Sequence, residues 1–171
     1  MDRMPSIELA LKNEQAEMEF YLNEARRSKN PLARTMFASL AKDEEEHMNR
    51  IRQLHQRLIS SGSWPADVPI EVQDTNVREV LDGLVKKQGS AADHDRDDEQ
   101  ALQRAAEFEA RGAKFYADLA ESCENPMEKN FFSFLSRIEK EHHLSVTDSL
   151  AYLSDPQAWM MEHERSGLDG A

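Results

Sequence analysis

The strongest constraint on the fold is an internal repeat, in which residues 14–47 align without a gap on residues 109–142. Each copy carries, at the same spacing, a Glu, a Phe-Tyr pair, an Asn-Pro pair and a Glu-x-x-His motif. Matching polar and aromatic residues at a fixed spacing indicate that one structural unit has been duplicated. The chain is therefore expected to contain two equivalent units that pack together.

The Asn-Pro pair in the middle of each copy predicts a turn between two helices. Asn30 can cap the start of a helix, and Pro31 fits the first helical turn, where no backbone N–H is needed. Asn125 and Pro126 occupy the same positions in the second copy. Apolar residues at helical spacing lie on both sides of each turn, so each copy is predicted to be a helical hairpin.

The second helix of each hairpin has two polar positions on its apolar stripe. In the first copy, Glu44 and His47 share the face that carries Leu40, because residues three or four apart project from the same side of a helix. The first helix of the hairpin brings one more Glu to the same level. The six polar residues that the two hairpins direct inward are Glu14, Glu44, His47, Glu109, Glu139 and His142.

Four inward-facing carboxylates need positive charge beside them, because an unpaired buried charge strongly destabilises a fold. Four carboxylates and two imidazoles suit two divalent first-row metal ions, with carboxylates that bridge the ions. A single Glu-x-x-His would be weak support for metal binding, since charged helices form it by chance, but two copies with a partner Glu each favour it. The alternative is a degenerate bundle in which these residues are buried salt-bridge partners. The zinc-peptidase motif His-Glu-x-x-His is absent.

Composition limits the partners and the compartment. The net charge is -12, with 33 acidic and 21 basic side chains, so nucleic acid and anionic membranes are not expected partners. The sequence has no apolar run of about 20 residues, and its first residues turn polar too early for a signal peptide, so a cytoplasmic location is expected. The single cysteine, Cys123, can form neither an intrachain disulfide nor a CxxC pair.

These patterns together predict an all-α fold with one domain over residues 1–171, in which two duplicated helical hairpins form an antiparallel four-helix bundle. A crossover at residues 60–92, rich in Gly and Pro at its start, is expected to contain a short helix. Pro156 is expected to end the fourth long helix and to begin a short C-terminal helix. Leu22 is expected on the buried stripe of the first helix.

The repeated motifs resemble those of the rubrerythrin branch of the ferritin-like superfamily, over nearly the whole chain. The resemblance implies a ferritin-like bundle with two iron ions, bound by the six polar residues named above. It also implies that Tyr21 and Tyr116, seven residues after the first Glu of each copy, hydrogen-bond to ligand carboxylates and orient them. The alternative for these two tyrosines is aromatic packing in the core.

The sequence departs from the rubrerythrin pattern in two ways. Rubrerythrins carry an additional Glu three residues after the third-helix ligand, where this chain has Gly112. Glu17, one turn after Glu14, is a candidate for the same carboxylate moved to the other hairpin and hence for a further metal ligand; the alternative is a partly exposed helix carboxylate. A rubrerythrin proper also has a four-cysteine rubredoxin module, which one cysteine cannot build.

The resemblance implies a dinuclear non-haem iron protein that oxidises Fe(II) while reducing hydrogen peroxide or dioxygen, in oxidative-stress defence or iron handling. An external electron donor, such as a rubredoxin-like protein, would then be needed. Manganese or zinc could replace iron, because the ligand types accept all three. The alternatives are a non-catalytic iron-binding or iron-trafficking protein and a structural bundle with a degenerate site. A homodimer is expected, with hairpins that can swap between subunits.

Overall fold

The computed structural model describes residues 4–64, 72–88 and 96–168, and within these ranges the chain forms helices and no strand. The all-α fold predicted from the sequence is confirmed. The predicted crossover at residues 60–92 is described only in part, because residues 65–71 and 89–92 lie outside the described ranges. The helices are α1 (Met4–Arg27), α2 (Pro31–Ser61), α3 (Val77–Gln88), α4 (Arg96–Glu121), α5 (Pro126–Ser154) and α6 (Pro156–Leu168).

Each hairpin turn is built by the Asn-Pro pair that the sequence repeats. The Asn30 side chain accepts hydrogen bonds from the backbone N–H groups of Leu32 and Ala33, at 2.8 and 3.1 Å. Asn125 accepts the same two bonds from the residues two and three positions after it. These bonds satisfy N–H groups that a helix start leaves without a helical partner, so α2 and α5 begin sharply after their turns.

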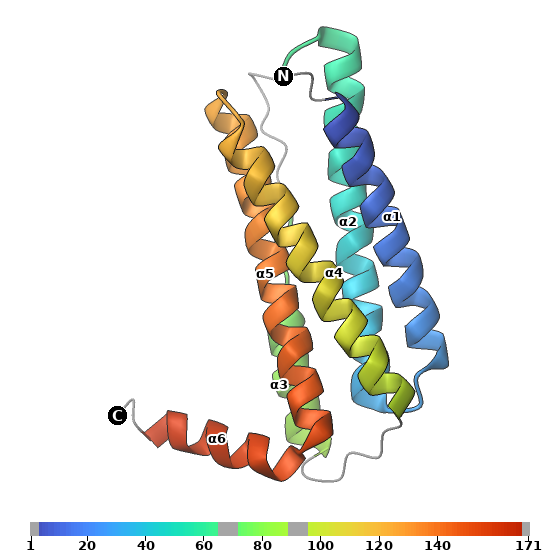
Figure 1. Ribbon diagram of the computed structural model, residues 1–171, viewed down its shortest axis with the longest axis vertical. Helices are drawn as coiled ribbons and strands as arrows, with labels where there is room; N and C mark the ends of the chain where they lie inside the picture. Colours follow the sequence, from blue (N-terminus) through green and yellow to red (C-terminus); the bar gives the residue numbers. More distant parts are fainter. Residues whose placement is uncertain (1–3, 65–71, 89–95, 169–171) are drawn as a thin grey trace.

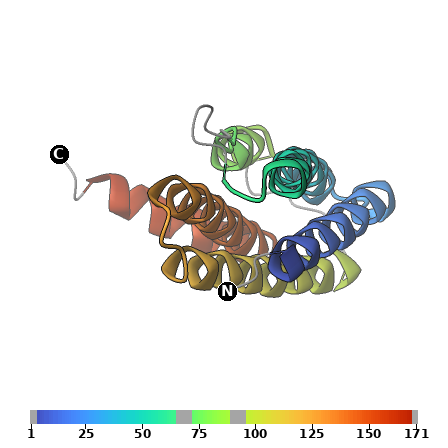
Figure 2. The same cartoon turned by 90° about the horizontal axis from the view of Figure 1, so that it is seen from above.

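The two hairpins, α1–α2 and α4–α5, stand side by side with their long axes nearly parallel (Figure 1). Helices within each hairpin run antiparallel, and the view along the bundle shows α3 lying beside α2 and α5 (Figure 2). Val77, Leu81 and Val85 bury the inner face of α3 in the core. The terminal helix α6 points away from the bundle (Figure 1) and packs on α5 through Trp159.

Apolar side chains form two clusters, one toward each end of the bundle. One cluster includes Phe37, Leu40 and Leu81, and the other includes Ile51 and Phe132. Burying one such side chain contributes about 1.5–3 kcal/mol. Because Leu40 and Ile51 belong to different clusters, the polar positions between them on α2 lie in a middle layer, with apolar packing above and below.

Leu22 does not lie on the buried stripe that the sequence suggested. Its side chain is 39% exposed, whereas the preceding Tyr21 is fully buried. Adjacent residues on a helix point about 100° apart. Because the Tyr21 side chain points into the core, that of Leu22 points toward solvent. None of the helices within the described ranges combines the length and apolarity needed to cross a membrane.

Candidate metal centre

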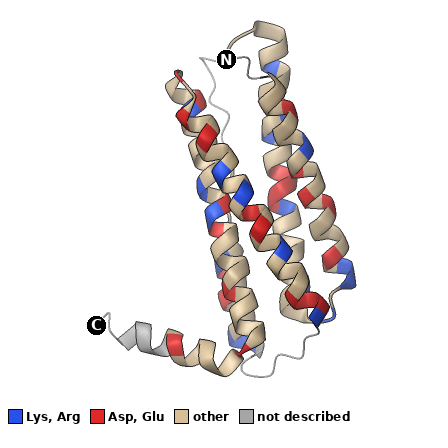
Figure 3. Cartoon of the chain, viewed as in Figure 1, with Lys and Arg blue, Asp and Glu red and all other residues tan. Residues whose placement is uncertain are grey.

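The middle layer of the bundle contains all six inward-facing polar residues that the repeat predicts. They come from α1, α2, α4 and α5, and each has at most 2% of its side chain exposed. Lys and Arg residues are spread along the helices (Figure 3), but none is among the buried residues of the described ranges. Within the described ranges the alternative of a degenerate salt-bridged bundle therefore has no buried Lys or Arg to offer these carboxylates, and His47 and His142 are their buried cationic partners.

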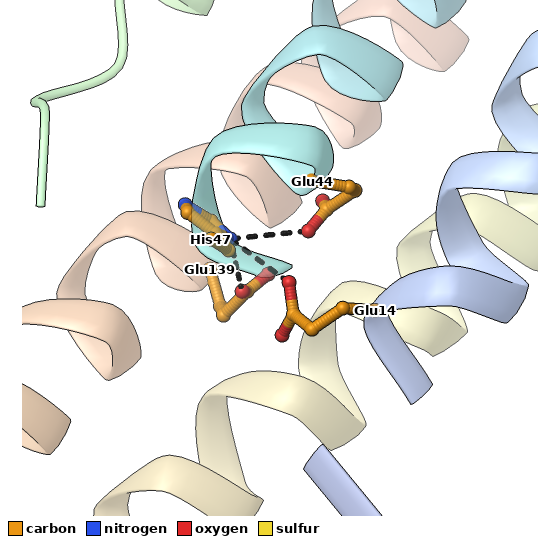
Figure 4. A group of neighbouring side chains, drawn as sticks. All are labelled: Glu14, Glu44, His47 and Glu139. Atoms are coloured by element: carbon orange, nitrogen blue, oxygen red, sulfur yellow. Dashed lines mark hydrogen bonds and ion pairs between the residues drawn. The ribbon is translucent and has the colours of Figure 1, made fainter. Parts of the chain in front are cut away.

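One half of the centre surrounds His47 (Figure 4). Its Nδ1 atom lies 3.2 Å from Glu14 Oε2, 3.1 Å from Glu44 Oε2 and 3.3 Å from Glu139 Oε1. These carboxylates come from α1, α2 and α5, so both hairpins contribute to this half.

The second half surrounds His142 in the corresponding way. Its Nδ1 atom lies 3.3 Å from Glu109 Oε2, 3.5 Å from Glu44 Oε1 and 3.7 Å from Glu139 Oε2. The two imidazole rings are nearly parallel, with centroids 5.8 Å apart. The duplication in the sequence thus corresponds to two facing sets of donor atoms.

Glu44 and Glu139 belong to both halves. Each carboxylate directs one oxygen toward His47 and the other toward His142. The donor atoms of each half lie within 4.8 Å of one another, and both sets include these two residues. Glu44 and Glu139 are therefore placed to bridge two metal ions, and Glu14 and Glu109 to bind one ion each.

Several donor atoms at the centre make no well-aligned hydrogen bond to any described residue, although imidazole Nδ1 atoms and carboxylate oxygens lie 3.3–3.7 Å apart there. They are Glu44 Oε1, Glu109 Oε2, both carboxylate oxygens of Glu139 and His142 Nδ1. A buried polar atom without a partner is costly, and a bound cation would remove that cost. Carboxylates and imidazoles are ordinary ligands of divalent iron, manganese and zinc. The residues present therefore fit a dinuclear metal site.

Tyr21 and Tyr116 each hydrogen-bond to a carboxylate of the other hairpin. The hydroxyl of Tyr21 on α1 donates to Glu109 Oε1 on α4, and the hydroxyl of Tyr116 on α4 donates to Glu14 Oε1 on α1. Both tyrosines are also stacked on core aromatic rings, so orientation of ligands and core packing are not exclusive. These crossed bonds leave the second oxygen of each carboxylate directed at the centre.

Asp43 is a functional candidate that the sequence reasoning missed. His142 Nε2 lies 3.0 Å from Asp43 Oδ2, and Thr75 Oγ1 donates to the same oxygen at 2.5 Å. A carboxylate that accepts from the outer nitrogen of a metal-binding imidazole fixes its tautomer and orientation. The position before Glu139 in the second copy is Ile138, so the repeat gave no signal. The only clue was an acidic residue directly before the Glu-x-x-His motif.

The carboxyl groups of the centre divide into two kinds by pKa. Burial raises the pKa of Glu14 and of Glu109 well above 4.5, and neighbouring carboxylates add to the effect. Burial acts in the same direction on Glu44 and Glu139, but interactions with His47 and His142 outweigh it and lower the pKa of both groups. The carboxyl groups of Glu44 and Glu139 therefore ionise at lower pH than those of Glu14 and Glu109.

The two imidazoles have raised pKa values. Burial disfavours the charge of His47, but the negative charge of Glu44 and the close carboxylates of Glu139 and Glu14 outweigh it and raise its pKa. His142 is raised in the same way, through the charge of Glu109 and the hydrogen bond to Asp43. The charges of the ligand side chains thus balance when two imidazolium groups face two ionised carboxylates, with the other two carboxyls protonated.

Glu17 lies beside the centre but outside the two sets of donor atoms. Its side chain is partly buried, one turn after Glu14. Burial, followed by the negative charge of Glu44 and Glu139, raises the pKa of Glu17 to about 11. Glu17 is therefore in the electric field of the ligand carboxylates without being one of the grouped ligands.

A four-helix bundle with two Glu-x-x-His motifs and two further Glu residues around shared carboxylates defines the ferritin-like dinuclear metal carboxylate proteins. Among them, the Rubrerythrin family model matches residues 6–150 of this chain. The chain belongs to the rubrerythrin family, whose members bind two iron ions. No curated protein and no solved structure matches the chain.

Proposed function

We propose that this protein binds two iron ions through Glu14, Glu44, His47, Glu109, Glu139 and His142 and transfers electrons from Fe(II) to hydrogen peroxide or dioxygen. The observation that carries the proposal is the position of Glu44 and Glu139, each with one oxygen toward each imidazole. Shared carboxylates hold two ions close together, which two separate mononuclear sites would not do.

A pair of ferrous ions would supply two electrons. With two protons, these convert hydrogen peroxide into two water molecules, or dioxygen into hydrogen peroxide. The residues of the chain would hold and orient the ions. Tyr21 and Tyr116 restrict rotation of the outer carboxylates, and Asp43 restrains His142. The apolar clusters above and below the layer restrict the access of water and so protect the reaction from side reactions.

Turnover would need electrons from outside these residues, because the 171 residues include one cysteine and cannot build a four-cysteine iron site. We propose an external donor of the rubredoxin type, acting in the cytoplasm. We also propose a homodimer, in which the crossover at residues 60–92 is the segment through which hairpins would exchange.

Glu17 is proposed as a fifth carboxylate, and so as a seventh ligand, that can move onto one of the ions. It is one turn from Glu14, and burial together with the negative charges of Glu44 and Glu139 raises the pKa of its carboxyl. If Glu17 binds metal, Glu17→Gln will weaken metal retention in the oxidised form, whereas Glu19→Gln on the exposed face of the same helix will not. Equal retention in both variants would show that Glu17 is a helix carboxylate without a ligand role.

The test of the function is metal content followed by rapid mixing. Protein from iron-supplied cells should hold two iron ions per chain, and the anaerobic ferrous form should be oxidised by peroxide or by air. Faster oxidation by peroxide would indicate a peroxidase, and faster oxidation by air a ferroxidase. Two bound iron ions without repeated turnover would favour an iron-binding or iron-trafficking protein.

Paired variants separate the centre from the helix surface. Glu109→Gln should lose metal, while Glu107→Gln, on the exposed face of the same helix, should keep both ions. Fewer than one ion per chain in the unmodified protein, unchanged by combining Glu44→Ala with His142→Ala, would disprove the dinuclear site.

A further inference from the structure

A cleft of about 450 Å³ is lined by residues of α1 and α4. Its volume falls within the range of about 300–1,000 Å³ that is usual for small-molecule sites, and hydrogen peroxide would fill only a small part of it. The lining residues that bear on its use are Ala16 and Glu17 on α1 and Phe108, Arg111, Gly112 and Phe115 on α4.

Gly112 brings the cleft close to the shared carboxylate. A Cβ atom at this position would lie 3.5 Å from both Cγ and Cδ of Glu139, in ordinary van der Waals contact, so no side chain separates the cleft from Glu139 at Gly112. Glu17 lines the same cleft, and the negative charge of Glu139 is one of the causes that raise the pKa of Glu17. None of the six buried ligand residues lines the cleft itself, but Gly112 lies between the cleft and Glu139.

The walls of the cleft are aromatic and held in place. Phe108 is half-buried, with the Phe20 ring packed edge-on at 5.1 Å and the Arg111 guanidinium 5.0 Å from its ring centre. Phe115 is also half-buried and packs edge-on against Tyr116, with ring centroids 5.3 Å apart. Such walls can bind an apolar group, while Glu17 and Arg111 supply polar groups at the same cleft.

We propose that the cleft admits an organic hydroperoxide, ROOH, with its R group against Phe108 and Phe115 and its peroxide end directed past Gly112 to the centre. The proposal rests on the proposed function. In the reaction the O–O bond breaks, two Fe(II) are oxidised to Fe(III), and two protons from solvent are taken up, so that ROOH gives ROH and water.

The first test measures binding without turnover. Zinc-loaded protein is titrated with 2-phenyl-2-propanol, the alcohol formed from cumene hydroperoxide, and the aromatic NMR resonances are followed. Ala16→Leu adds volume from α1 and Gly112→Leu adds volume from α4, and each is expected to weaken binding at least tenfold, about 1.4 kcal/mol. Ala158→Leu, exposed on α6, is the matched control and should bind as the unmodified protein does.

The second test compares two oxidants on the ferrous protein in a single turnover. Ala16→Leu is expected to slow oxidation by cumene hydroperoxide about tenfold or more and to change oxidation by hydrogen peroxide less than about twofold. This tenfold slowing matches the tenfold loss of affinity for the alcohol that the first test expects of the same variant. Zinc content is measured for every variant, because a side chain at Gly112 would be in contact with the proposed ligand Glu139. Oligomeric mass is measured as well, to show whether a substitution in the cleft alters association between copies of the chain.

The outcomes separate this proposal from the proposed function. Failure of hydrogen peroxide and of air to oxidise the ferrous protein overturns both. Oxidation by hydrogen peroxide with no binding of the alcohol, or with equal slowing of both oxidants by Ala16→Leu, overturns only the hydroperoxide site. A change in oligomeric mass in Ala16→Leu would show that the cleft is an interface between copies of the chain, which also overturns it.

Discussion

Tyr116 on α4 hydrogen-bonds to Glu14 on α1, a residue 102 positions earlier in the sequence. Both side chains are almost fully buried, and the bond joins the two hairpins at the level of the metal centre. The carboxylate is therefore oriented by the hairpin to which it does not belong, so that correct assembly of the two hairpins and correct placement of the ligand depend on the same contact.

We predict that Tyr116→Phe weakens both stability and metal binding. Removing one partner of a buried hydrogen bond to a carboxyl group costs about 1–3 kcal/mol, and loss of a group that orients a ligand costs about 10–100-fold in metal affinity. Urea unfolding and zinc competition with a chelator measure the two effects. Tyr152→Phe is the control, because it removes a hydroxyl from a buried tyrosine outside the centre. This variant should bind zinc as tightly as the unmodified protein. Unchanged affinity in Tyr116→Phe would leave that tyrosine with a packing role only.

We predict that Asp43→Asn affects one of the two ions. His142 is the imidazole that Asp43 contacts, at 3.0 Å, whereas Ile138 holds the equivalent position in the other half. The ion beside His142 should be released about 10–100-fold more easily. A competition titration should therefore show two separated steps in the variant, and Glu45→Gln, at the next and exposed position, should not produce them. A uniform loss of both ions would contradict the asymmetry.

The sequence was sufficient for the fold and for the six candidate ligands because the duplication repeats each polar position. A single Glu on an apolar stripe is ambiguous, but Glu44 and Glu139 support one another through their equal positions. Asp43 had no counterpart, and its contact with His142 joins residues 99 positions apart. Such a contact depends on the packing of α2 against α5, which helical periodicity does not specify.

Leu22 and Gly112 show a second limit of sequence reasoning. A helical stripe defines a face only to within about one residue, so a large aromatic residue such as Tyr21 can displace its neighbour Leu22 to the surface. Gly112 is a departure from the family pattern that the sequence alone shows, but the cleft that it helps to line depends on the distance between α1 and α4. Neither outcome is encoded in spacing along one helix.

We predict that metal binding releases protons. The pKa values of Glu14, Glu109, His47 and His142 are all raised, and each of these groups must lose a proton to bind a metal ion. Calorimetric titration with zinc in buffers of different ionisation enthalpy measures the number released near neutral pH. About one proton from each of the four groups is expected. Release close to zero would show that the groups are already deprotonated before metal binds.

We also predict that the metal-free protein loses stability as pH rises above about 5. The pKa values of Glu14 and Glu109 are raised above their ordinary value of 4.5. Between that value and the raised one, the folded state holds more protons than the unfolded state, so the free energy of unfolding falls with pH. His47 and His142 act in the same direction above 6.5, since their pKa values are also raised.

Glu44 and Glu139 act in the opposite direction but in a different pH window. Their pKa values are lowered, so the stability they contribute is present above pH 4.5 and is lost only as the pH falls below 4.5 through the folded-state pKa.

Urea unfolding of chelator-treated protein at several pH values from about 5 to 8 covers the window in which only the groups with raised pKa values titrate. Glu14→Gln should flatten the decline, whereas Glu107→Gln should leave it unchanged. Zinc-loaded protein should instead gain stability over the same range, because metal binding strengthens as its ligands lose protons. A metal-free protein that became more stable between pH 5 and 8 would contradict the assigned protonation of the outer carboxyls and the imidazoles.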